Sequence, residues 1–432
     1  MKITFIGATK DVTGSMTLLE NSAGKILIDC GLYQGPNEVV KKNLLPLPFN
    51  PKNIDAIILT HAHLDHSGLI PRLTRVGFRG QIFCTKPTMK LAHIIMADSA
   101  HIMERNEHHL LNGFYESPDV VVATSLFKTK KLHAPFDVLG MTVTFQSSGH
   151  ILGAVSVHIV DGADSAVFSG DLGRSNDPMN FPPEACPKAK TIVMESTYGG
   201  KVRSGNMHVE LINFLKKIKA ESKVGIIASF AVARAQLLIT LIQQFYKDHP
   251  EEKVRMIIDG PMMTEANKIY KEFSDLTRMP EELRNALEDL DIIDHVSEWN
   301  SIRKKDGPLI IISSSGMIAG GRIWRYIENW QNDKSAVVFL PGYQAEGTPG
   351  KELSIGNRNI QSEDGTPIHW SGEIVSSSAF SSHADQNELM AWLTNVDKET
   401  KIFLIHGEYE SKLALKKKLL ELGYKNCIIP ES

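Results

Sequence analysis

The run His61-Ala62-His63-Leu64-Asp65-His66 follows directly on Ile54-Asp55-Ala56-Ile57-Ile58-Leu59-Thr60. The second stretch is short and apolar, which is typical of a buried strand, so the candidate ligands fall where a strand ends. Imidazoles and a carboxylate at this spacing suit a borderline-soft cation such as zinc. A His-rich surface turn is the alternative, but with 16 His in 432 residues HxHxDH has a chance expectation on the order of 10⁻³. The run therefore predicts a metal site.

Composition indicates a folded protein with no general attraction to polyanions. The chain has 432 residues, 42% of them hydrophobic and 22% charged, which suffices for two or three domains. Its net charge is −3, so a nucleic acid would have to be attracted by a local positive surface. The sequence shows no secretory signal and no apolar stretch of membrane-spanning length, so we expect a cytoplasmic protein with no membrane partner.

The positions of the cysteines indicate which ligand types the metal site does not use. Cys30, Cys84, Cys186 and Cys427 are far apart and form no CxxC pair. This spacing argues against a sulfur-ligated zinc and against a disulfide scaffold.

Short β-branched runs separated by turn signals fill the first half of the chain, and they favour strands with helices packed outside. A helix is expected at about Pro87–Asn112, with His93, His101, His108 and His109 on its solvated face. The predicted strands are Lys25–Asp29, Ile54–Thr60, Gln81–Cys84, Met141–Gln146, Val155–Val160, Ala166–Ser169 and Thr191–Glu195.

From about Met207 the sequence pattern changes to longer strands and helices in alternation, which is typical of a parallel-sheet α/β domain. The final segment returns to strand signals and ends in an amphipathic helix. The predicted elements here are helices at Val209–Ala220 and Ala231–Tyr246, a helix from about Thr264, strands at Val224–Ala228, Arg255–Asp259, Leu309–Ser313 and Ala336–Leu340, and finally Glu373–Ser376, Ile402–Ile405 and the helix Glu410–Leu422.

One cluster of four ligands cannot complete two catalytic zinc sites, so further ligands are expected elsewhere. Three residues share one context, because each follows a strand-like run and has a glycine beside or close to it: His150 in Ser147–Gly153, Asp171 in Phe168–Gly173 and His406 in Ile402–Glu408. Glycine lets a loop bend sharply and lets backbone approach a ligand closely. Taken alone, each of these three is a weak signal.

Taken together, these residues resemble the metallo-β-lactamase-fold hydrolases of the β-CASP group, nucleases that include the cleavage-and-polyadenylation endonuclease and its bacterial and archaeal relatives. The resemblance covers essentially the whole chain, and the motifs occur in one order. They are Val12-Thr13-Gly14-Ser15, Ile28-Asp29-Cys30-Gly31, the HxHxDH run, His150, Asp171, Glu195-Ser196-Thr197-Tyr198-Gly199, Ser229–Gln236, Ser314-Ser315-Gly316-Met317, Phe380–Asp385 with His383, and His406.

The resemblance implies an α/β fold, a metallo-β-lactamase αββα sandwich with an inserted parallel-sheet α/β β-CASP domain. The expected domains are a first part of the metallo-β-lactamase domain at 1–203, the β-CASP domain at 204–372, and the C-terminal part of the first domain at 373–432.

The resemblance also implies two zinc ions per chain. His61, His63 and His150 would bind one ion, Asp65, His66 and His406 the other, and Asp171 would bridge them. Two zincs roughly 3.5–4 Å apart can hold a bridging hydroxide at neutral pH, because metal coordination lowers the pKa of bound water to about 7. Asp29 is expected to orient a ligand histidine rather than to bind metal.

A proton for the departing sugar oxygen requires a general acid, and His383 is the candidate because imidazole titrates near the working pH. Glu195 could hydrogen-bond His383, fix its tautomer and raise its pKa. With Asp65 and Asp171 on the metals, these residues form the predicted catalytic set. From the residues alone, the loop around His383 could equally be a helix N-cap.

The middle domain has two places where a strand ends in small polar residues before a helix with an arginine. These are Ser229 ahead of Arg234, and Ser315 ahead of Arg322. Helix N-termini with a nearby arginine are phosphate sites, so these four residues are predicted to hold substrate phosphates. Ordinary N-caps remain the alternative.

The predicted function is that of a zinc-dependent endoribonuclease, which acts on single-stranded RNA and leaves 5′-phosphate and 3′-hydroxyl ends. A homodimer is the expected assembly to be considered. The alternatives are a 5′-3′ exoribonuclease or a DNA nuclease of the same family, a small-molecule hydrolase of the same fold, and a catalytically dead RNA-binding subunit. His406 disfavours the DNA branch, which tends to have valine there. The long middle domain disfavours small substrates, and the complete ligand set disfavours a dead site.

Overall fold

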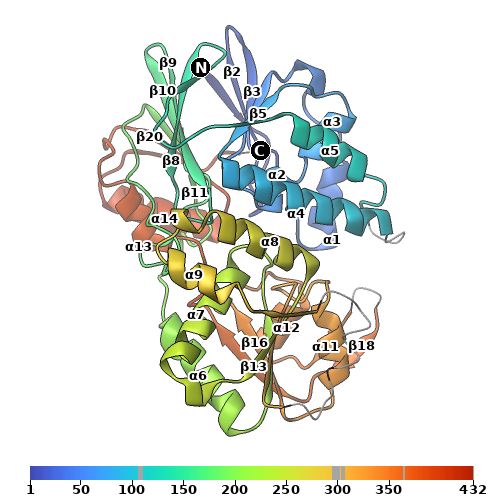
Figure 1. Ribbon diagram of the computed structural model, residues 1–432. Coiled ribbons are helices and arrows are strands. Elements are labelled where there is room, and N and C mark those ends of the chain that lie inside the picture. Colours follow the sequence, from blue (N-terminus) through green and yellow to red (C-terminus); the bar gives the residue numbers. More distant parts are fainter. Residues whose placement is uncertain (106–109, 294–301, 303–306, 363–364, 432) are drawn as a thin grey trace. The chain divides into compact units, whose positions relative to one another are not determined.

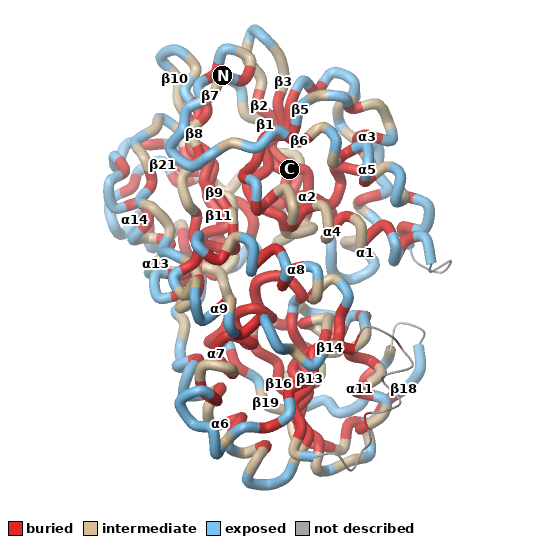
Figure 2. The backbone as a smooth tube through the Cα atoms, in the orientation of Figure 1, coloured by how far each residue is buried: buried red, intermediate tan, exposed pale blue. Residues whose placement is uncertain are grey.

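The computed structural model describes residues 1–432 apart from 106–109, 294–301, 303–306, 363–364 and 432 (Figure 1). The chain forms two compact units. The first contains Met1–Val202 and Ser382–Ser432, and the second contains Arg203–Ser381. Each unit has its own buried interior, with the exposed residues on loops and outer helix faces (Figure 2).

Two mixed β-sheets make up the centre of the first unit. The six-stranded sheet has the order β1 (Lys2–Phe5), β2 (Thr17–Asn21), β3 (Gly24–Ile28), β4 (Ala56–Ile58), β5 (Gln81–Cys84) and β6 (Phe127–Thr129). The seven-stranded sheet has the order β21 (Asn426–Ile428), β20 (Lys401–Ile405), β11 (Thr191–Glu195), β10 (Asp164–Phe168), β9 (Val155–Asp161), β8 (Met141–Ser147) and β7 (Phe136–Val138).

The two sheets pack face to face through apolar side chains that alternate along the strands. On β8, Met141, Val143 and Phe145 are buried, whereas Thr142 between them is exposed. They join one core with residues of the other sheet such as Ile58. Strand β4 is buried along its whole length, as its uninterrupted apolar sequence predicts.

Helices lie beside both sheets, which gives the predicted αββα sandwich (Figure 1). Helices α3 (Ile70–Arg75), α4 (Lys86–Arg105) and α5 (Ser117–Ser125) lie beside the six-stranded sheet. Helices α13 (Gln386–Trp392) and α14 (Tyr409–Glu421) bury Leu389, Trp392 and Leu415 against Ile192 and Met194 of β11. The fold class predicted from the sequence is therefore confirmed for this unit.

The second unit contains a six-stranded, wholly parallel sheet. Its order is β14 (Asp291–Ile293), β13 (Arg255–Asp259), β15 (Leu309–Ser313), β12 (Val224–Ala228), β16 (Ala336–Pro341) and β19 (Glu373–Ser377), with a separate hairpin of β17 (Asn359–Gln361) and β18 (Pro367–His369). Its helices are α6 (Met207–Ala220), α7 (Arg234–Asp248), α8 (Pro261–Glu272), α9 (Pro280–Ala286), α11 (Ile323–Trp330) and α12 (Pro349–Ser354).

The second unit is an insertion between two neighbouring strands of the first. Strands β11 and β20 pair in parallel, with Thr191 opposite Lys401, and the intervening chain forms the second unit before it returns. The predicted first boundary, at 203/204, differs from the structural one by a single residue. The predicted second boundary, at 372/373, moves to 381/382, because β19 pairs with β16 of the inserted sheet.

The predicted helix at Pro87–Asn112 corresponds to α4, which ends at Arg105. His101 is exposed on α4, as expected. His93 is half-buried instead, because its Nδ1 lies 2.9 Å from Thr124 Oγ1 on α5. His108 and His109 lie outside the described residues. All four cysteines are buried free thiols. Among the helices in the described part of the chain, none combines the length and apolar character that a membrane crossing requires.

Lys412 on α14 is a fully buried lysine that predicts an unusual pH dependence of stability. Its Nζ donates a hydrogen bond to Thr9 O, and burial lowers the pKa of its ammonium group to about 8. Between about pH 8 and 10.5 the unfolded chain therefore binds more protons than the folded one, so the free energy of unfolding should rise with pH through this window.

Urea unfolding at a series of pH values tests this. Relative to Lys412→Met, the wild type should gain about 3 kcal/mol between pH 8 and 10.5, from 1.36 kcal/mol per pKa unit. Parallel curves for the two proteins would contradict the assignment.

Candidate metal centre

The HxHxDH run lies at the carboxyl end of β4, as predicted. His63 directly precedes the short helix α2 (Leu64–Ser67), which carries Asp65 and His66, and the His66 and Ser67 N–H groups donate to His63 O. Helix α2 packs closely on the chain after β3, where Cys30 N donates to His66 O. A Cβ at Gly31 would lie 1.6 Å from Asp65 O, so this approach requires glycine.

The other predicted ligands follow the carboxyl ends of three further strands. His150 follows β8, Asp171 follows β10 and His406 follows β20, and all three are almost fully buried. His406 has a φ of 49°, a left-handed conformation that a histidine adopts only when its surroundings hold it. The fold thus brings the side chains together although they are far apart in sequence.

The first set of ligand atoms comes from His61, His63, His150 and Asp171, and these atoms all lie within 4.8 Å of one another. His63 Nδ1 is 3.1 Å from His61 Nε2 and 3.3 Å from His150 Nε2. Asp171 Oδ2 lies 3.5 Å from His61 Nε2 and 3.6 Å from His150 Nε2. Three imidazoles and one carboxylate oxygen are the kind of donor set that zinc takes in catalytic sites.

The second set comes from Asp65, His66 and His406. His66 Nε2 is 3.0 Å from His406 Nε2, which in turn lies 3.3 Å from Asp65 Oδ2. Asp171 also faces this set, because its Oδ1 lies 3.2 Å from His66 Nε2 and 3.6 Å from His406 Nε2. The two oxygens of Asp171 therefore point toward different sets, which is the arrangement that a bridging carboxylate needs.

The protonation states of the first set suit metal binding. Burial lowers the pKa of His61 and His150 well below the ordinary range and lowers that of His63 to about 4, so all three imidazoles are neutral at pH 7. A neutral imidazole is the form that binds metal. Asp171 Oδ1 is buried and has no hydrogen-bond partner among the described residues. Such a carboxylate oxygen is costly unless a cation compensates it, so these residues fit a metal pair.

Residues behind the ligands fix the orientation of the imidazole rings. Asp29 Oδ2 lies 2.7 Å from His66 Nδ1, and the two Asp29 oxygens accept hydrogen bonds from Thr60 N and Thr60 Oγ1. Thr60 Oγ1 also lies 3.1 Å from His61 Nδ1. Asp29 thus stands behind a ligand histidine, in the place expected for an orienting residue, and it belongs to neither ligand set.

Two orienting threonines were not identified from the sequence. The first is Thr60. The second is Thr197, whose Oγ1 lies 3.1 Å from His406 Nδ1 and so orients the ring of a histidine 209 residues further along the chain. Their positions in the sequence could have indicated this role, because Thr60 directly precedes the HxHxDH run and Thr197 lies in the same short motif as Glu195. A ring-orienting hydroxyl beside each ligand run is a feature that could have been sought.

His383 and Glu195 lie next to the ligand sets as a hydrogen-bonded pair. His383 Nδ1 is 3.2 Å from Glu195 Oε1 and 3.9 Å from Asp171 Oδ2. Glu195 is buried, and its oxygens accept hydrogen bonds from the N–H groups of Leu172 and Thr197. Burial lowers the pKa of His383, but Glu195 outweighs burial and the pKa is raised overall. The arrangement favours a protonated imidazole.

The four residues predicted to hold phosphates all lie at the carboxyl ends of strands in the second unit. Ser229 follows β12, is fully buried, and donates its hydroxyl to Phe230 O at 3.1 Å. Arg234 begins α7, and its Nη1 donates to Pro341 O at 2.9 Å. Ser315 Oγ is buried without a partner among the described residues. Of the four residues, Ser315 is therefore the best candidate to form a hydrogen bond with a phosphate.

Arg322 requires a correction. Its Nη1 lies 2.6 Å from the Oδ1 of Asp259, a fully buried carboxylate, and also donates to Ile293 O at 3.1 Å. The Tyr326 hydroxyl donates to the other oxygen of Asp259. Breaking a buried ion pair costs several kcal/mol, so Arg322 acts as the counter-ion of Asp259 rather than as a phosphate ligand. No sequence pattern indicates this pairing, because Asp259 and Arg322 lie on different strand–helix units.

Family profiles match three regions of the chain. Residues 9–208 match the metallo-beta-lactamase superfamily, residues 235–353 match the Beta-Casp domain, and residues 368–430 match the Zn-dependent metallo-hydrolase RNA specificity domain. These regions follow one another along the chain in the order that the sequence motifs predict.

Related proteins align over nearly the whole chain. Ribonuclease TTHA0252 of Thermus thermophilus is 30% identical over 98% of this chain and 97% of its own length. Transcription termination factor FttA of Methanosarcina mazei is 29% identical over 94% of this chain and 67% of its own. Integrator complex subunit 11 of Gallus gallus is 26% identical, with 100% of this chain and 72% of that protein aligned.

A solved structure shares the fold. A protein of unknown function from Enterococcus faecalis V583 superposes with a TM-score of 0.61 over 99% of this chain and 97% of that one, at 14% sequence identity.

Proposed function

Because the chain belongs to the metallo-β-lactamase hydrolases that carry a β-CASP domain, we propose that it is a zinc-dependent endoribonuclease acting on single-stranded RNA. The products would carry 5′-phosphate and 3′-hydroxyl ends. The observation that carries the proposal is the pair of ligand sets that face the two oxygens of Asp171, with the His383–Glu195 pair beside them.

The first zinc ion would be held by His61, His63 and His150, and the second by Asp65, His66 and His406, with Asp171 shared. When bound, such a metal pair activates water at neutral pH and places positive charge near phosphate oxygens. Asp29 and the two orienting threonines keep the ring nitrogens aimed at the ions. The chain's own contribution is thus a buried set of imidazole and carboxylate donors whose orientations are fixed by hydrogen bonds.

His383 would donate the proton that the departing 3′ oxygen needs. With Nδ1 bound to Glu195, the transferable proton sits on Nε2, and Glu195 stabilises the charged ring before transfer. Two backbone N–H groups hold the buried Glu195 carboxylate in place. Glu195 therefore positions the acid, and His383 makes the contact with the reacting atoms.

Two comparisons support RNA as the substrate. A relative aligned over almost its whole length is named a ribonuclease, and the C-terminal region matches a profile described as an RNA specificity domain. A 5′-3′ exoribonuclease or DNA nuclease of this family is the second candidate. The cytoplasmic location and the homodimer stay predictions.

A circular single-stranded RNA tests the proposal. The wild-type protein should linearise the circle, and His63→Ala or a chelator should abolish this, with zinc restoring activity to the chelated wild type only. Metal analysis should find two zinc ions per chain. Intact circles beside degraded linear 5′-monophosphate RNA would establish the exonuclease instead.

A further inference from the structure

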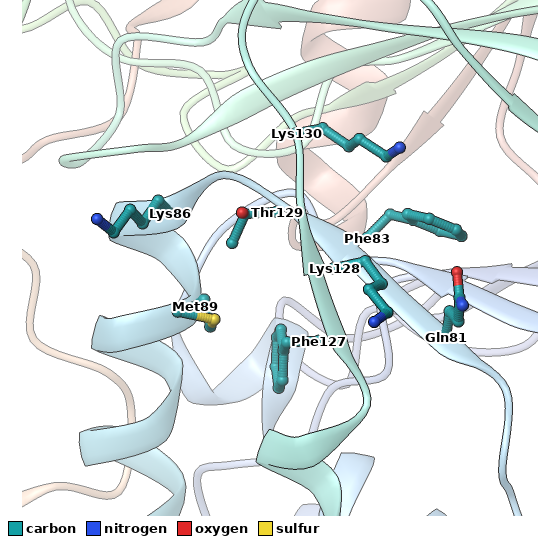
Figure 3. Close-up of a pocket in the computed structure, with 8 residues that line it drawn as sticks. All are labelled: Gln81, Phe83, Lys86, Met89, Phe127, Lys128, Thr129 and Lys130. Carbon is teal, nitrogen blue, oxygen red and sulfur yellow. The ribbon is translucent and has the colours of Figure 1, made fainter.

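A pocket of about 470 Å³ lies in the first unit beside β6, the outer strand of the six-stranded sheet, and its lining contains none of the candidate ligands. Figure 3 shows Lys86, Met89 and Phe127 on one side of β6, and Phe83 and Lys130 on the other. The full lining is Gln81, Phe83, Lys86, Met89, Phe127, Lys128, Thr129 and Lys130. The hollow therefore follows the outer strand of the sheet.

The lining is strongly positive. It contains three lysines and no carboxylate, although the whole chain has a net charge of −3. Within the described residues, neither Lys128 nor Lys130 forms an ion pair. Lys130 Nζ is held instead over two aromatic rings, 5.4 Å from the Phe83 centroid and 4.7 Å from that of Phe136. The pocket therefore presents lysine charge that the protein itself does not neutralise.

The pocket lies at the same sheet edge as the metal ligands. Strands β4, β5 and β6 are parallel neighbours, with Ile58 opposite Phe83 and Phe83 opposite Lys128. Because strands lie about 4.8 Å apart, Lys128 is roughly 10 Å from the strand that leads to His61. The start of α4, which carries Lys86, is fixed beside the loop that follows His150, since Thr85 and Thr88 both donate hydrogen bonds to Gly153 O.

We propose that this basic pocket binds phosphates of the RNA strand a few nucleotides from the bond that is cut, a role that rests on the proposed function. The argument is charge complementarity, because a polyanion can pair with Lys128 and Lys130, which no carboxylate neutralises within the described residues. A stacked strand rises about 3.4 Å per nucleotide, so roughly three nucleotides span the distance from β4. The aromatic rings under Lys130 restrict its side chain and so lower the entropy cost of binding.

Edge strands often carry lysine simply to prevent pairing with another sheet. That explanation covers Lys128, but Lys86 lies on α4 rather than on the edge strand, and Lys130 follows the strand and turns over two rings. A purely protective role predicts no effect of these lysines on RNA binding.

The test compares Lys128→Gln/Lys130→Gln with the wild type on RNA and on bis(4-nitrophenyl) phosphate, a diester too small to reach the pocket. The KM for RNA should rise several-fold while kcat stays unchanged, and kinetics on the small diester should not change. RNA affinity measured in a His383→Ala background should show a salt slope smaller by about 1.4, because each lost phosphate contact removes about 0.7. Arginine at both positions should restore binding, and the exposed pair Lys188→Gln/Lys190→Gln serves as the matched control.

An unchanged RNA KM and salt slope would overturn the inference, as would a glutamine variant that aggregates yet binds RNA normally. If the wild type cleaved neither substrate, the proposed function would fail, and the salt slope alone would decide whether the pocket binds RNA.

Discussion

Asp171→Asn is expected to lower kcat for RNA cleavage by roughly a thousandfold or more, because a shared metal ligand supports several kcal/mol of transition-state stabilisation. The two oxygens of Asp171 face both ligand sets, at 3.5 Å from His61 Nε2 and 3.2 Å from His66 Nε2. Asparagine keeps the shape of the side chain but offers only one good acceptor and no charge. Both sites should weaken together.

Zinc content and activity should be measured on the same preparations. We expect fewer than two zinc ions per chain in Asp171→Asn, with an unchanged unfolding temperature in the presence of chelator. Asp164→Asn, at the other end of β10, is the matched control, because its carboxylate pairs with the chain N-terminus rather than with a candidate ligand. A variant that kept two zinc ions and full activity would refute the shared role of Asp171.

His383→Ala is expected to lower kcat for RNA by roughly 10²–10⁴, the range that general acid catalysis supplies, while zinc content stays unchanged. The leaving group separates this role from a structural one. In an RNA with sulfur in place of the 3′ bridging oxygen, the leaving group is a thiolate, which departs without a proton. His383→Ala should therefore cut this RNA nearly as fast as the wild type does.

Glu195→Gln should show the same pattern in a weaker form, since Glu195 acts through His383. His369→Ala, an exposed histidine of the second unit, is the control and should change neither substrate's kinetics. Equal losses on the oxygen and sulfur substrates would mean that His383 does not donate the proton.

Continuous apolar runs allowed several strands to be predicted with their precise ends. The bounds of β5, β11, β12, β13 and β15 match the predicted ranges, because each is a short apolar run flanked by polar or turn residues. The hairpin of β17 and β18 was not predicted, since each of its strands buries only one apolar side chain, Ile360 or Ile368. Strand β19 was recognised, but its sequence carries no sign of which sheet it joins.

The candidate site was only partly accessible from local sequence. The HxHxDH run identified a metal site by itself, because its ligands are adjacent. His150, Asp171, His383 and His406 needed the family resemblance, since each is a single residue beside a glycine. The roles of Thr60 and Arg322 needed the structure, because hydrogen bonds and ion pairs between distant segments leave no periodic pattern.

The insertion between β11 and β20 also means that the candidate site is completed late during synthesis of the chain. His383 lies 188 residues after Glu195, and His406 lies 209 residues after Thr197. At about 5–20 residues per second, the ribosome takes roughly 10–40 s to cover the longer interval. For most of that interval the emerging chain holds the HxHxDH run but lacks both His383 and His406, the proposed acid and the last proposed ligand.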